Sequence, residues 1–476
     1  MRKPATNFTK SQSQSALGTL VGSAVGDALG APFEFKPAGT YRARFPQAVL
    51  GGKAEMVGGG PFNWAPGEFT DDTQLALALA ESLLANNHSF DPEQTWAHFT
   101  AWSRRATDVG ITTSTVLRQS DWRNAAELAH KELERTASNG SVMRIAPIGI
   151  VGARLSTAET VEIAIAQSAL THFDPRAGWA AALAAELISS LIHGHDFDAV
   201  LAALPDLVDD EHNDLYAGLL SPTWEPGVAI GQSNGSAMIC LAQAVWAVRT
   251  TSSFEEAVTV AVDLGHDTDT VGAVTGAIAG ARYGIQGIPS RWSTPLNGVV
   301  AQLDGTMRHY RCRDLQAIAH RLIGKPSRPE QSPEPARGPQ IVHEVGVHAA
   351  NLVGAIESDP RFAVVSLCRT GDSFVNRSHH REIYMIDQEG DDNPSLGMVL
   401  DDAVRSVDAF LAEGKEVIVH CHGGRSRTGL VLKAWYMRRY GVSHDEAHDW
   451  LERQWSLYST WNSRFSEFLD DEWMVK

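Results

Sequence analysis

A cysteine and an arginine stand six positions apart in the string HCHGGRSRTG, residues 420–429, near the end of the chain. An apolar run precedes the string and a helix-like segment follows it, which predicts a strand, a glycine-bearing loop and a helix. The backbone N–H groups of such a loop and the positive end of the helix converge on a phosphate, and Arg427 can hold two of its oxygens. The same field favours the reactive thiolate of Cys421. We interpret the string as a phosphate cradle around a nucleophile.

The neighbours of Cys421 and Arg427 support this interpretation. Gly423 and Gly424 leave the backbone of the loop open to an anion, and Arg425 adds a positive charge. A structural alternative, in which a buried cysteine closes a strand and the arginines are solvated, is less favoured. The string resembles the phosphate loop of cysteine-based protein tyrosine and dual-specificity phosphatases. In that family, the residue at Thr428 would help Cys421 to leave the phosphorylated intermediate.

The resemblance also requires an acid that protonates the leaving oxygen. In these phosphatases the acid lies about thirty residues before the cysteine, on a loop after a strand. The string YMIDQEGDDNP, residues 384–394, supplies Asp387, Asp391 and Asp392. Asp387 is preferred because it directly follows an apolar, strand-like run. The other two aspartates remain open.

Three acidic clusters lie far apart in the first three hundred residues, each at an expected helix end. They contain Asp27 and Glu34; Thr70, Asp71 and Asp72; and Asp267, Asp269 and Thr270. Carboxylate and hydroxyl oxygens are the ligands that Mg²⁺, Mn²⁺ or Ca²⁺ prefers, and a dinuclear site would neutralise neighbouring buried aspartates. Each cluster alone fits helix capping better. The three together favour a metal site.

These clusters resemble the ADP-ribosylglycohydrolase family over about residues 15–320. The strings that carry the resemblance are GSAVGDALGAPFEF, GGGPFNWAPGEFTDDTQLAL, DVGITT, SNGSVMRIAP, Thr171-His172 and GHDTDTVGAVTGAIAGARYG. The family fold is an all-α orthogonal helical bundle that holds two Mg²⁺ or Mn²⁺ ions below a cleft for ADP-ribose. By this resemblance the ion ligands are Thr70, Asp71, Asp72, Asp267, Asp269 and Thr270, with Glu34 beside them. His266, next to the ligands, departs from the family pattern, in which glycine or another small or basic residue is more frequent.

The chemistry implied is cleavage of a glycosidic bond at the ribose anomeric carbon, with oxocarbenium character in the transition state. Asp72 or Glu34 would act as base or would stabilise the developing positive charge. Gly140 and Ser141 lie in a glycine-bearing string where backbone can approach a pyrophosphate. Arg144 could reach that pyrophosphate or could brace the loop. A structural role is favoured for His172.

The pattern of apolar residues divides the chain. Helical periodicity dominates residues 15–324, the proline-rich segment 325–340 has linker composition, and residues 341–476 alternate short apolar strands with helices. We therefore expect an all-α ADP-ribosylglycohydrolase-like domain, a linker, and an α/β dual-specificity-phosphatase-like domain with a small parallel sheet.

Composition limits the possible partners. The 476 residues carry a formal charge of −17, which argues against general binding to nucleic acid or anionic membranes. The four cysteines lack metal-type spacing, and a working Cys421 needs a reducing compartment. Neither a signal peptide nor a membrane span is expected, so the protein should be cytoplasmic.

The sequence thus predicts a bifunctional hydrolase. One domain would cleave an ADP-ribosyl bond with divalent ions, and the other would release phosphate through Cys421. The partners would be an ADP-ribosylated protein, nucleic acid or small molecule and a phosphorylated substrate, possible examples being ADP-ribose phosphates. In the alternative hypothesis the C-terminal domain recognises phosphate without turnover.

Overall fold

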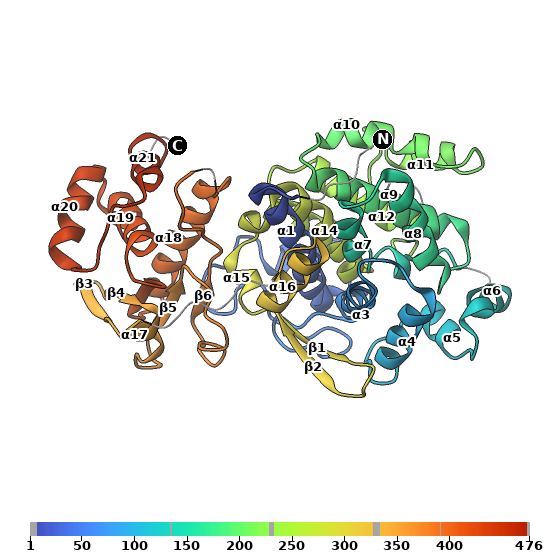
Figure 1. Cartoon of the computed structure of the whole chain (residues 1–476), viewed down its shortest axis with the longest axis horizontal. Helices are drawn as coiled ribbons and strands as arrows, with labels where there is room; N and C mark the ends of the chain where they lie inside the picture. Colours follow the sequence, from blue (N-terminus) through green and yellow to red (C-terminus); the bar gives the residue numbers. More distant parts are fainter. Residues whose placement is uncertain (1–6, 134–135, 228–232, 327–333, 391, 474–476) are drawn as a thin grey trace. The chain divides into compact units, whose positions relative to one another are not determined.

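The computed structural model describes residues 7–133, 136–227, 233–326, 334–390 and 392–473 (Figure 1). The chain forms two compact units. Unit 1 comprises residues 1–47, 56–288 and 295–327, and unit 2 comprises residues 48–55, 289–294 and 328–476. Each unit carries one of the two groups of chemically informative residues.

Unit 1 is mainly helical, as the sequence predicted. Its elements are α1 (Lys10–Gly30), η1 (Ala31–Phe33), α2 (Thr40–Arg44), α3 (Asp71–Ala85), α4 (Pro92–Ser103), α5 (Ile111–Leu117), α6 (Trp122–Glu132), η2 (Asn139–Ser141), α7 (Ala146–Gly152), α8 (Thr157–Ala169), α9 (Pro175–Ile192), α10 (Phe197–Ala203), η3 (Pro205–Leu207), α11 (Asn213–Leu219), α12 (Ala237–Arg249), α13 (Phe254–Val262), α14 (Thr268–Tyr283), η4 (Ile285–Gly287), β1 (Asn297–Ala301), β2 (Met307–Arg311) and α16 (Cys312–Leu322). The antiparallel hairpin of β1 and β2 is an addition to the expected all-helical pattern.

The centre of unit 1 is a backbone-to-backbone contact between α1 and α14, which lie side by side in Figure 1. Glycines recur every fourth residue on both helices and face each other. A Cβ at Gly22 would lie 2.3 Å from the carbonyl oxygen of Gly276, and a Cβ at Gly26 would lie 1.9 Å from that of Gly272. Any side chain at these positions would force the helices apart. This close approach brings the end of α1 to the start of α14, where two of the acidic clusters lie.

The segment Lys10–Phe33 is long and apolar enough to cross a membrane by length and composition alone. Its apolar window is completely buried inside unit 1. The core helix of a folded domain passes the same test, and the glycine contacts give α1 that place in the core.

Unit 2 is an α/β fold built on a five-stranded sheet of order β3-β4-β7-β5-β6. Its elements are α15 (Ser290–Ser293), β3 (Gln340–His343), β4 (Val347–Asn351), α17 (Leu352–Ile356), β5 (Ala363–Ser366), β6 (His380–Glu382), α18 (Leu396–Ala412), β7 (Val417–Cys421), α19 (Ser426–Tyr440), α20 (His444–Gln454) and α21 (Ser463–Asp471). The four strands from β4 to β6 are parallel, and β3 adds an antiparallel edge. The central strand β7 is buried along its whole length and ends at Cys421.

Two short segments that are distant in sequence complete unit 2. The buried guanidinium of Arg381 donates to the carbonyl oxygens of Leu50 and Gly52. Asp402 accepts a 2.9 Å hydrogen bond from the backbone N–H of Ser290. Residues 48–55 and 289–294 therefore belong to the packing of the sheet domain.

The expected linker, residues 325–340, is only partly described, because residues 327–333 lie outside the described residues. From Glu334 onward the segment is part of unit 2. The backbone N–H of Arg337 donates to Asn351, and the side-chain amide of Asn351 donates to the carbonyl oxygen of Pro335. The second half of the proline-rich segment is thus attached to the end of β4.

The close contact between the glycines of α1 and α14 predicts that a side chain there lowers stability. Gly22→Ala should lower the free energy of unfolding of unit 1 by about 1–3 kcal/mol, because the new methyl group overlaps backbone that cannot retreat. Gly218→Ala on α11 is the matched control, since no atom lies within 4 Å of the added Cβ, and it should be neutral or slightly stabilising. Denaturant unfolding of the full chain measures both. Equal stability of the two variants would contradict the proposed role of the contact.

Candidate active sites

The structure brings the three acidic clusters of unit 1 together. Asp27 lies near the end of α1, Glu34 directly follows η1, Asp71 begins α3, and Asp269 lies in the first turn of α14. The carboxyl groups are close enough to repel one another. Asp71 contributes to the raised pKa of Asp72, and Glu34 contributes to that of Asp269, in both cases after burial. The sequence-predicted set of Glu34, Thr70, Asp71, Asp72, Asp267, Asp269 and Thr270 therefore forms one site.

Asp27 holds this site in place. Its buried carboxylate accepts hydrogen bonds from the backbone N–H of Thr70 at 3.0 Å and of Thr73 at 3.1 Å. It also accepts from their hydroxyl groups, at 2.8 Å and 2.5 Å. Because these donors start α3, Asp27 fixes the position of the Asp71-Asp72 pair. Sequence analysis noted Asp27 in its cluster but assigned it no role, since the partners lie more than forty residues away.

Burial and mutual repulsion disfavour the charged forms of these carboxyl groups. Burial above all, and then Asp108 and Asp267, raise the pKa of Glu34 to about 8. The pKa values of Asp71, Asp72 and Asp269 lie well above their usual range, first because of burial and then because of neighbouring carboxylates. Asp108, a further acid of the site, has a pKa raised to about 6, mainly by burial.

The donor set suits a hard cation, because it consists of carboxylate and hydroxyl oxygens. Among the residues that the structure describes, no three His, Cys, Asp or Glu side chains are set closely enough to hold an ion as they stand. Two oxygen atoms of the site, Oδ1 of Asp72 and Oε2 of Glu34, are buried without a hydrogen-bond partner in the described part of the chain. Buried polar atoms are normally paired, so these two oxygens fit the role of ligand atoms.

The loop from Phe35 to Ala38 contacts the backbone beside Asp267. The N–H of Phe35 donates to the carbonyl oxygen of His266, and the N–H of His266 donates to that of Lys36. His266 adopts a left-handed backbone with φ of 62°, and its side chain is exposed. Two short backbone hydrogen bonds therefore hold Glu34 beside the start of α14.

The loop of Gly140 and Ser141 lies next to the acidic site. Asn139, its first residue, donates a 2.8 Å hydrogen bond to Asp267. A Cβ at Gly140 would lie 2.9 Å from the imidazole of His172, so this glycine gives the ring its room. The hydroxyl of Ser141 is buried and accepts from Ser168.

Arg144 and His172 are buried side chains of the bundle. Arg144 donates to the side chain and carbonyl oxygen of Gln167 and to Thr171, and its guanidinium lies 4.5 Å from the ring centroid of Phe99. The sequence left open whether Arg144 reaches a pyrophosphate or braces the loop. These contacts favour the bracing role. Burial lowers the pKa of His172 to about 3, so its ring is neutral and bonded to Ser138 and Thr171.

In unit 2, residues 421–426 connect the end of β7 to the start of α19 and form the expected loop. Gly424 has φ of 69°, and an added Cβ there would lie 2.8 Å from the carbonyl oxygen of Ala350. Trp455 donates a 2.6 Å hydrogen bond to the carbonyl oxygen of Gly424. The turn therefore needs glycine for both conformation and space. Cys421 and Thr428 are buried at the two ends of this turn, and the hydroxyl of Thr428 has no partner in the described part of the chain.

Arg427 is held at the carboxyl edge of the sheet. Its Nη1 donates to the carbonyl oxygens of Leu367 at 2.7 Å and Met385 at 3.2 Å. Its Nε lies 3.5 Å from the carboxylate of Asp387. The guanidinium thus links the segments after β5 and β6 to the loop that carries Cys421.

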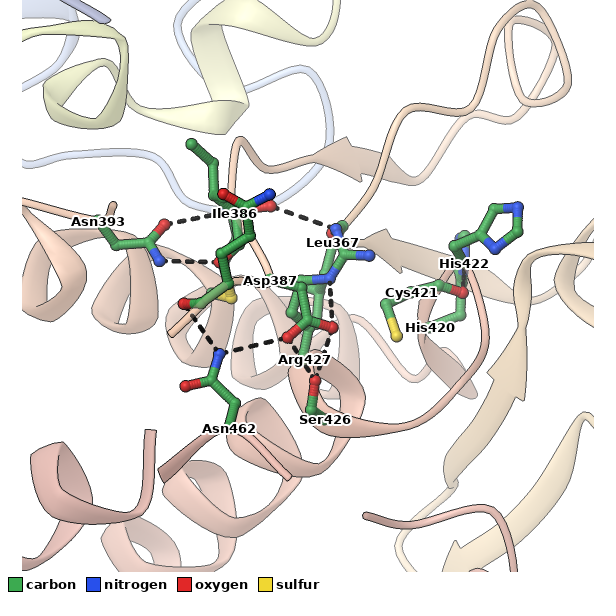
Figure 2. A network of polar contacts seen from close by, with 12 residues as sticks. Leu367, Ile386, Asp387, Asn393, His420, Cys421, His422, Ser426, Arg427 and Asn462 are labelled. Atoms are coloured by element: carbon green, nitrogen blue, oxygen red, sulfur yellow. Dashed lines mark hydrogen bonds and ion pairs between the residues drawn. The ribbon is translucent and has the colours of Figure 1, made fainter. Parts of the chain in front are cut away.

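Asp387 contacts the start of α19 at the end of this loop. Its carboxylate accepts from the hydroxyl of Ser426 at 2.6 Å and from the amide of Asn462 at 3.3 Å, and Figure 2 shows these side chains pointing toward one another. Asn393 pairs with the backbone of Ile386 through both its amide atoms and so fixes the residue before Asp387. Asn462 was missed by sequence analysis, because nothing local marks a residue 75 positions beyond its partner.

Asp391 and Asp392 were the other two candidate acids. Asp392 is buried, and Asp391 lies outside the described residues. The described geometry therefore brings Asp387 to the loop, the candidate that the sequence preferred.

A buried chain of polar side chains lies next to Cys421. The ring of His420 is within 2.7 Å of the hydroxyl of Ser366, which is also 3.0 Å from the ring of His380. Burial lowers the pKa of His420 to about 3. The residue before Cys421 is therefore a neutral imidazole in a fixed orientation.

Comparison with known proteins supports the two family resemblances. Residues 9–331 match the family model for ADP-ribosylglycohydrolase, and residues 359–466 match that for the catalytic domain of dual specificity phosphatases. The chain is 34% identical to ADP-ribosylarginine hydrolase Tri1 of Serratia proteamaculans, over 58% of this chain and 74% of that protein. It is 32% identical to ADP-ribosyl-[dinitrogen reductase] glycohydrolase of Rhodospirillum rubrum, over 59% and 90%. A solved structure, an ADP-ribosylglycohydrolase-related protein complex, matches with a TM-score of 0.53 and 34% identity, over 66% of this chain and 99% of that one.

The buried, neutral ring of His420 predicts how the stability of unit 2 depends on pH. Its folded pKa of about 3 lies below the ordinary 6.5, so the folded state binds fewer protons and stability falls as the pH falls below 6.5. One such group accounts for about 2 kcal/mol between pH 6.5 and pH 5. His420→Gln should flatten the decline in the free energy of unfolding of unit 2 by this amount. His195→Gln, at an exposed position, serves as control. An unchanged slope in the His420 variant would rule out this linkage.

Proposed function

Because this chain belongs to the ADP-ribosylglycohydrolase family and also carries a dual specificity phosphatase catalytic domain, we propose that it is a bifunctional hydrolase with two separate chemistries. Unit 1 would cleave an ADP-ribosyl glycosidic bond with divalent ions. Unit 2 would hydrolyse a phosphate monoester through Cys421. The observation that carries the first activity is the single acidic site made from three distant segments. The second is supported by Asp387 and Arg427 meeting at the Cys421 loop.

The ligands of two Mg²⁺ or Mn²⁺ ions would be Thr70, Asp71, Asp72, Asp267, Asp269 and Thr270, with Glu34 beside them. Bound ions would supply charge neutralisation, a hold on ribose hydroxyls and an acidified water. The unpartnered oxygens of Asp72 and Glu34 support this assignment.

The protein's own residues would orient the substrate and manage the charge at the anomeric carbon. Asp72 or Glu34 would accept the proton of the attacking water or stabilise the oxocarbenium ion. The backbone around Gly140 would face the pyrophosphate, held near the acidic site by the hydrogen bond from Asn139 to Asp267. Arg144 and Ser141 would keep this loop in place from inside the bundle.

In unit 2, the sulfur of Cys421 would form a bond to phosphorus while the ester P–O bond breaks. Protonated Asp387 would give its proton to the leaving oxygen, and Arg427 with the loop N–H groups would hold the other phosphate oxygens. Water would then release phosphate, with the Thr428 hydroxyl assisting departure of the thiolate. A thiolate nucleophile requires a reducing compartment, so we propose that the protein acts in the cytoplasm.

A second candidate function for unit 2 is phosphate recognition without turnover. The hydrogen bonds that Asp387 accepts from Ser426 and Asn462 favour this alternative, because they occupy the carboxylate that would have to carry a proton. Turnover that depends on both Cys421 and Asp387 would exclude it.

The substrate of unit 1 is an ADP-ribosylated protein, nucleic acid or small molecule. Since two of the similar proteins are named ADP-ribosylarginine hydrolases, arginine-linked ADP-ribose is the first linkage to test. A panel of ADP-ribosyl linkages and ADP-ribose phosphates, read by mass spectrometry, would also show whether both units act on one molecule.

The metal assignment predicts separable activities. EDTA, or Asp269→Asn, should abolish release of ADP-ribose while phosphate release persists, because Asp269 lies only in the acidic site of unit 1. Asp304→Asn, the same change in the exposed turn between β1 and β2, should leave both activities intact. Mass spectrometry of ADP-ribose and an assay of free phosphate measure the two reactions. Full ADP-ribose release by metal-free Asp269→Asn protein would disprove the metal site.

The nucleophile assignment predicts the opposite pattern. Cys421→Ser should reduce phosphate release from an aryl phosphate to background and leave ADP-ribose release unchanged. Asp387→Asn should slow turnover of a substrate with a poor leaving group by about 10²-fold or more, and that of an activated aryl ester far less. Cys312→Ser, in unit 1, is the control. Wild-type turnover by Cys421→Ser would mean that another group attacks phosphorus.

A further inference from the structure

A carboxylate from the proline-rich segment lies against the phosphate loop of unit 2. Oε2 of Glu334 is 3.5 Å from Nη2 of Arg425, and Oε1 is 4.0 Å from Nδ1 of His422. These are the two cationic or potentially cationic side chains on either side of the Gly423-Gly424 pair. An internal anion therefore sits beside the cradle, on residues that do not belong to the Arg427–Asp387 contact.

Glu334 is positioned by the end of β4. Asn351, fully buried, donates to the carbonyl oxygen of Pro335 at 2.8 Å, and its backbone N–H donates to that of Arg337 at 2.9 Å. Asn351 is also the residue of β4 that stands opposite Cys421 in the parallel register. The segment after Glu334 is thus fastened to the same edge of the sheet from which the phosphate loop starts.

Gly423 leaves room for this carboxylate. A Cβ at Gly423 would lie 3.4 Å from Oε1 of Glu334 and 3.5 Å from Nε of Arg425. Its φ is not in the left-handed region, so the backbone alone does not demand glycine there. A Cβ at these distances would make ordinary van der Waals contact, so the carboxylate of Glu334 lies directly against Gly423.

We propose that Arg425 and His422 form a subsite for a second anionic group of the substrate, a phosphate or diphosphate, and that Glu334 occupies this subsite until the substrate displaces it. This inference rests on the proposed phosphatase function. Arginine binds carboxylate and phosphate through the same donors, and the phosphate carries more charge. The pair is long and its side chains are 55% and 37% exposed, so its loss costs little.

The subsite selects a class of substrate. A simple monoester has no second anionic group that can replace Glu334 on Arg425, so its turnover should depend little on either side chain. A monoester that also carries a diphosphate gains the contact with Arg425. Phosphorylated ADP-ribose compounds have this chemistry, so the substrate class of unit 1 would supply the second anion that unit 2 accepts.

The test compares two substrates on the full-length protein. p-Nitrophenyl phosphate has one anionic group, and an ADP-ribose with a phosphate monoester on its terminal ribose has a second. Arg425→Gln should lower kcat/KM for the ADP-ribose phosphate about 10-fold more than for the aryl phosphate, mainly through KM. Glu334→Gln should raise kcat/KM for the ADP-ribose phosphate about 3-fold and affect the aryl phosphate less. Arg361→Gln and Glu357→Gln are charge-matched controls on exposed parts of unit 2.

Equal effects of Arg425→Gln on the two substrates would overturn the subsite. An equal gain on both from Glu334→Gln, or a loss on both, would overturn the role of Glu334 as a displaceable occupant. If the wild type shows no Cys421-dependent turnover at all, the phosphatase function fails and the subsite is judged by calorimetric binding of both compounds to Cys421→Ser protein. There, weaker binding of the ADP-ribose phosphate after adding Arg425→Gln supports the subsite, and unchanged binding refutes it.

Discussion

Direct contact between the backbones of α1 and α14 is the constraint on which the first active site depends. The two helices approach until an added Cβ at Gly18 would lie 2.3 Å from the carbonyl oxygen of Gly280. Because the contact extends along both helices, it sets where α1 ends relative to where α14 begins. Asp27 and Asp269 occupy those two ends, and Asp27 in turn orients the first turn of α3. The glycines therefore determine the spacing of carboxylates that come from three parts of the chain.

This arrangement concentrates negative charge in a buried place, which is unfavourable without compensation. Part of the compensation is visible, since four hydrogen bonds from Thr70 and Thr73 counter the burial of Asp27, whose pKa is raised to about 6. Burial first, and then repulsion from neighbouring carboxylates, raise the pKa values of Glu34 and Asp72. Divalent ions would remove this repulsion, so the electrostatic need of the fold and the chemistry of the proposed reaction coincide.

Unit 2 meets the reverse electrostatic problem. The proposed phosphatase reaction would require it to attract a phosphate in a protein with a net charge of −17, and the donors at the end of β7 would provide the local attraction. The guanidinium of Arg427 contacts backbone carbonyl oxygens and the carboxylate of Asp387. These contacts would fix the orientation of the guanidinium before an anion binds. Within the described part of the chain, the guanidinium of Arg425 has the longer, 3.5 Å contact with Glu334, which suits a group that exchanges one anion for another.

The sequence by itself determined the two enzyme families and the class of fold, because both rest on short strings and local periodicity. HCHGGRSRTG predicts a strand, loop and helix from the six-position spacing of Cys421 and Arg427, and the helical periodicity of unit 1 is local in the same way. Only the tertiary structure decided which distant groups meet. Arg144 braces α8, Asn462 reaches Asp387 and Glu334 lies on the phosphate loop, each through contacts across 23 to 91 positions. The α1–α14 contact could not be predicted from the sequence either. Glycines at every fourth position predict a helix face without side chains, but they do not identify the helix that packs against it. Local propensity and motif spacing are encoded in neighbouring residues. The long-range contacts form only when the chain brings distant segments together, and no local pattern specifies which segments meet.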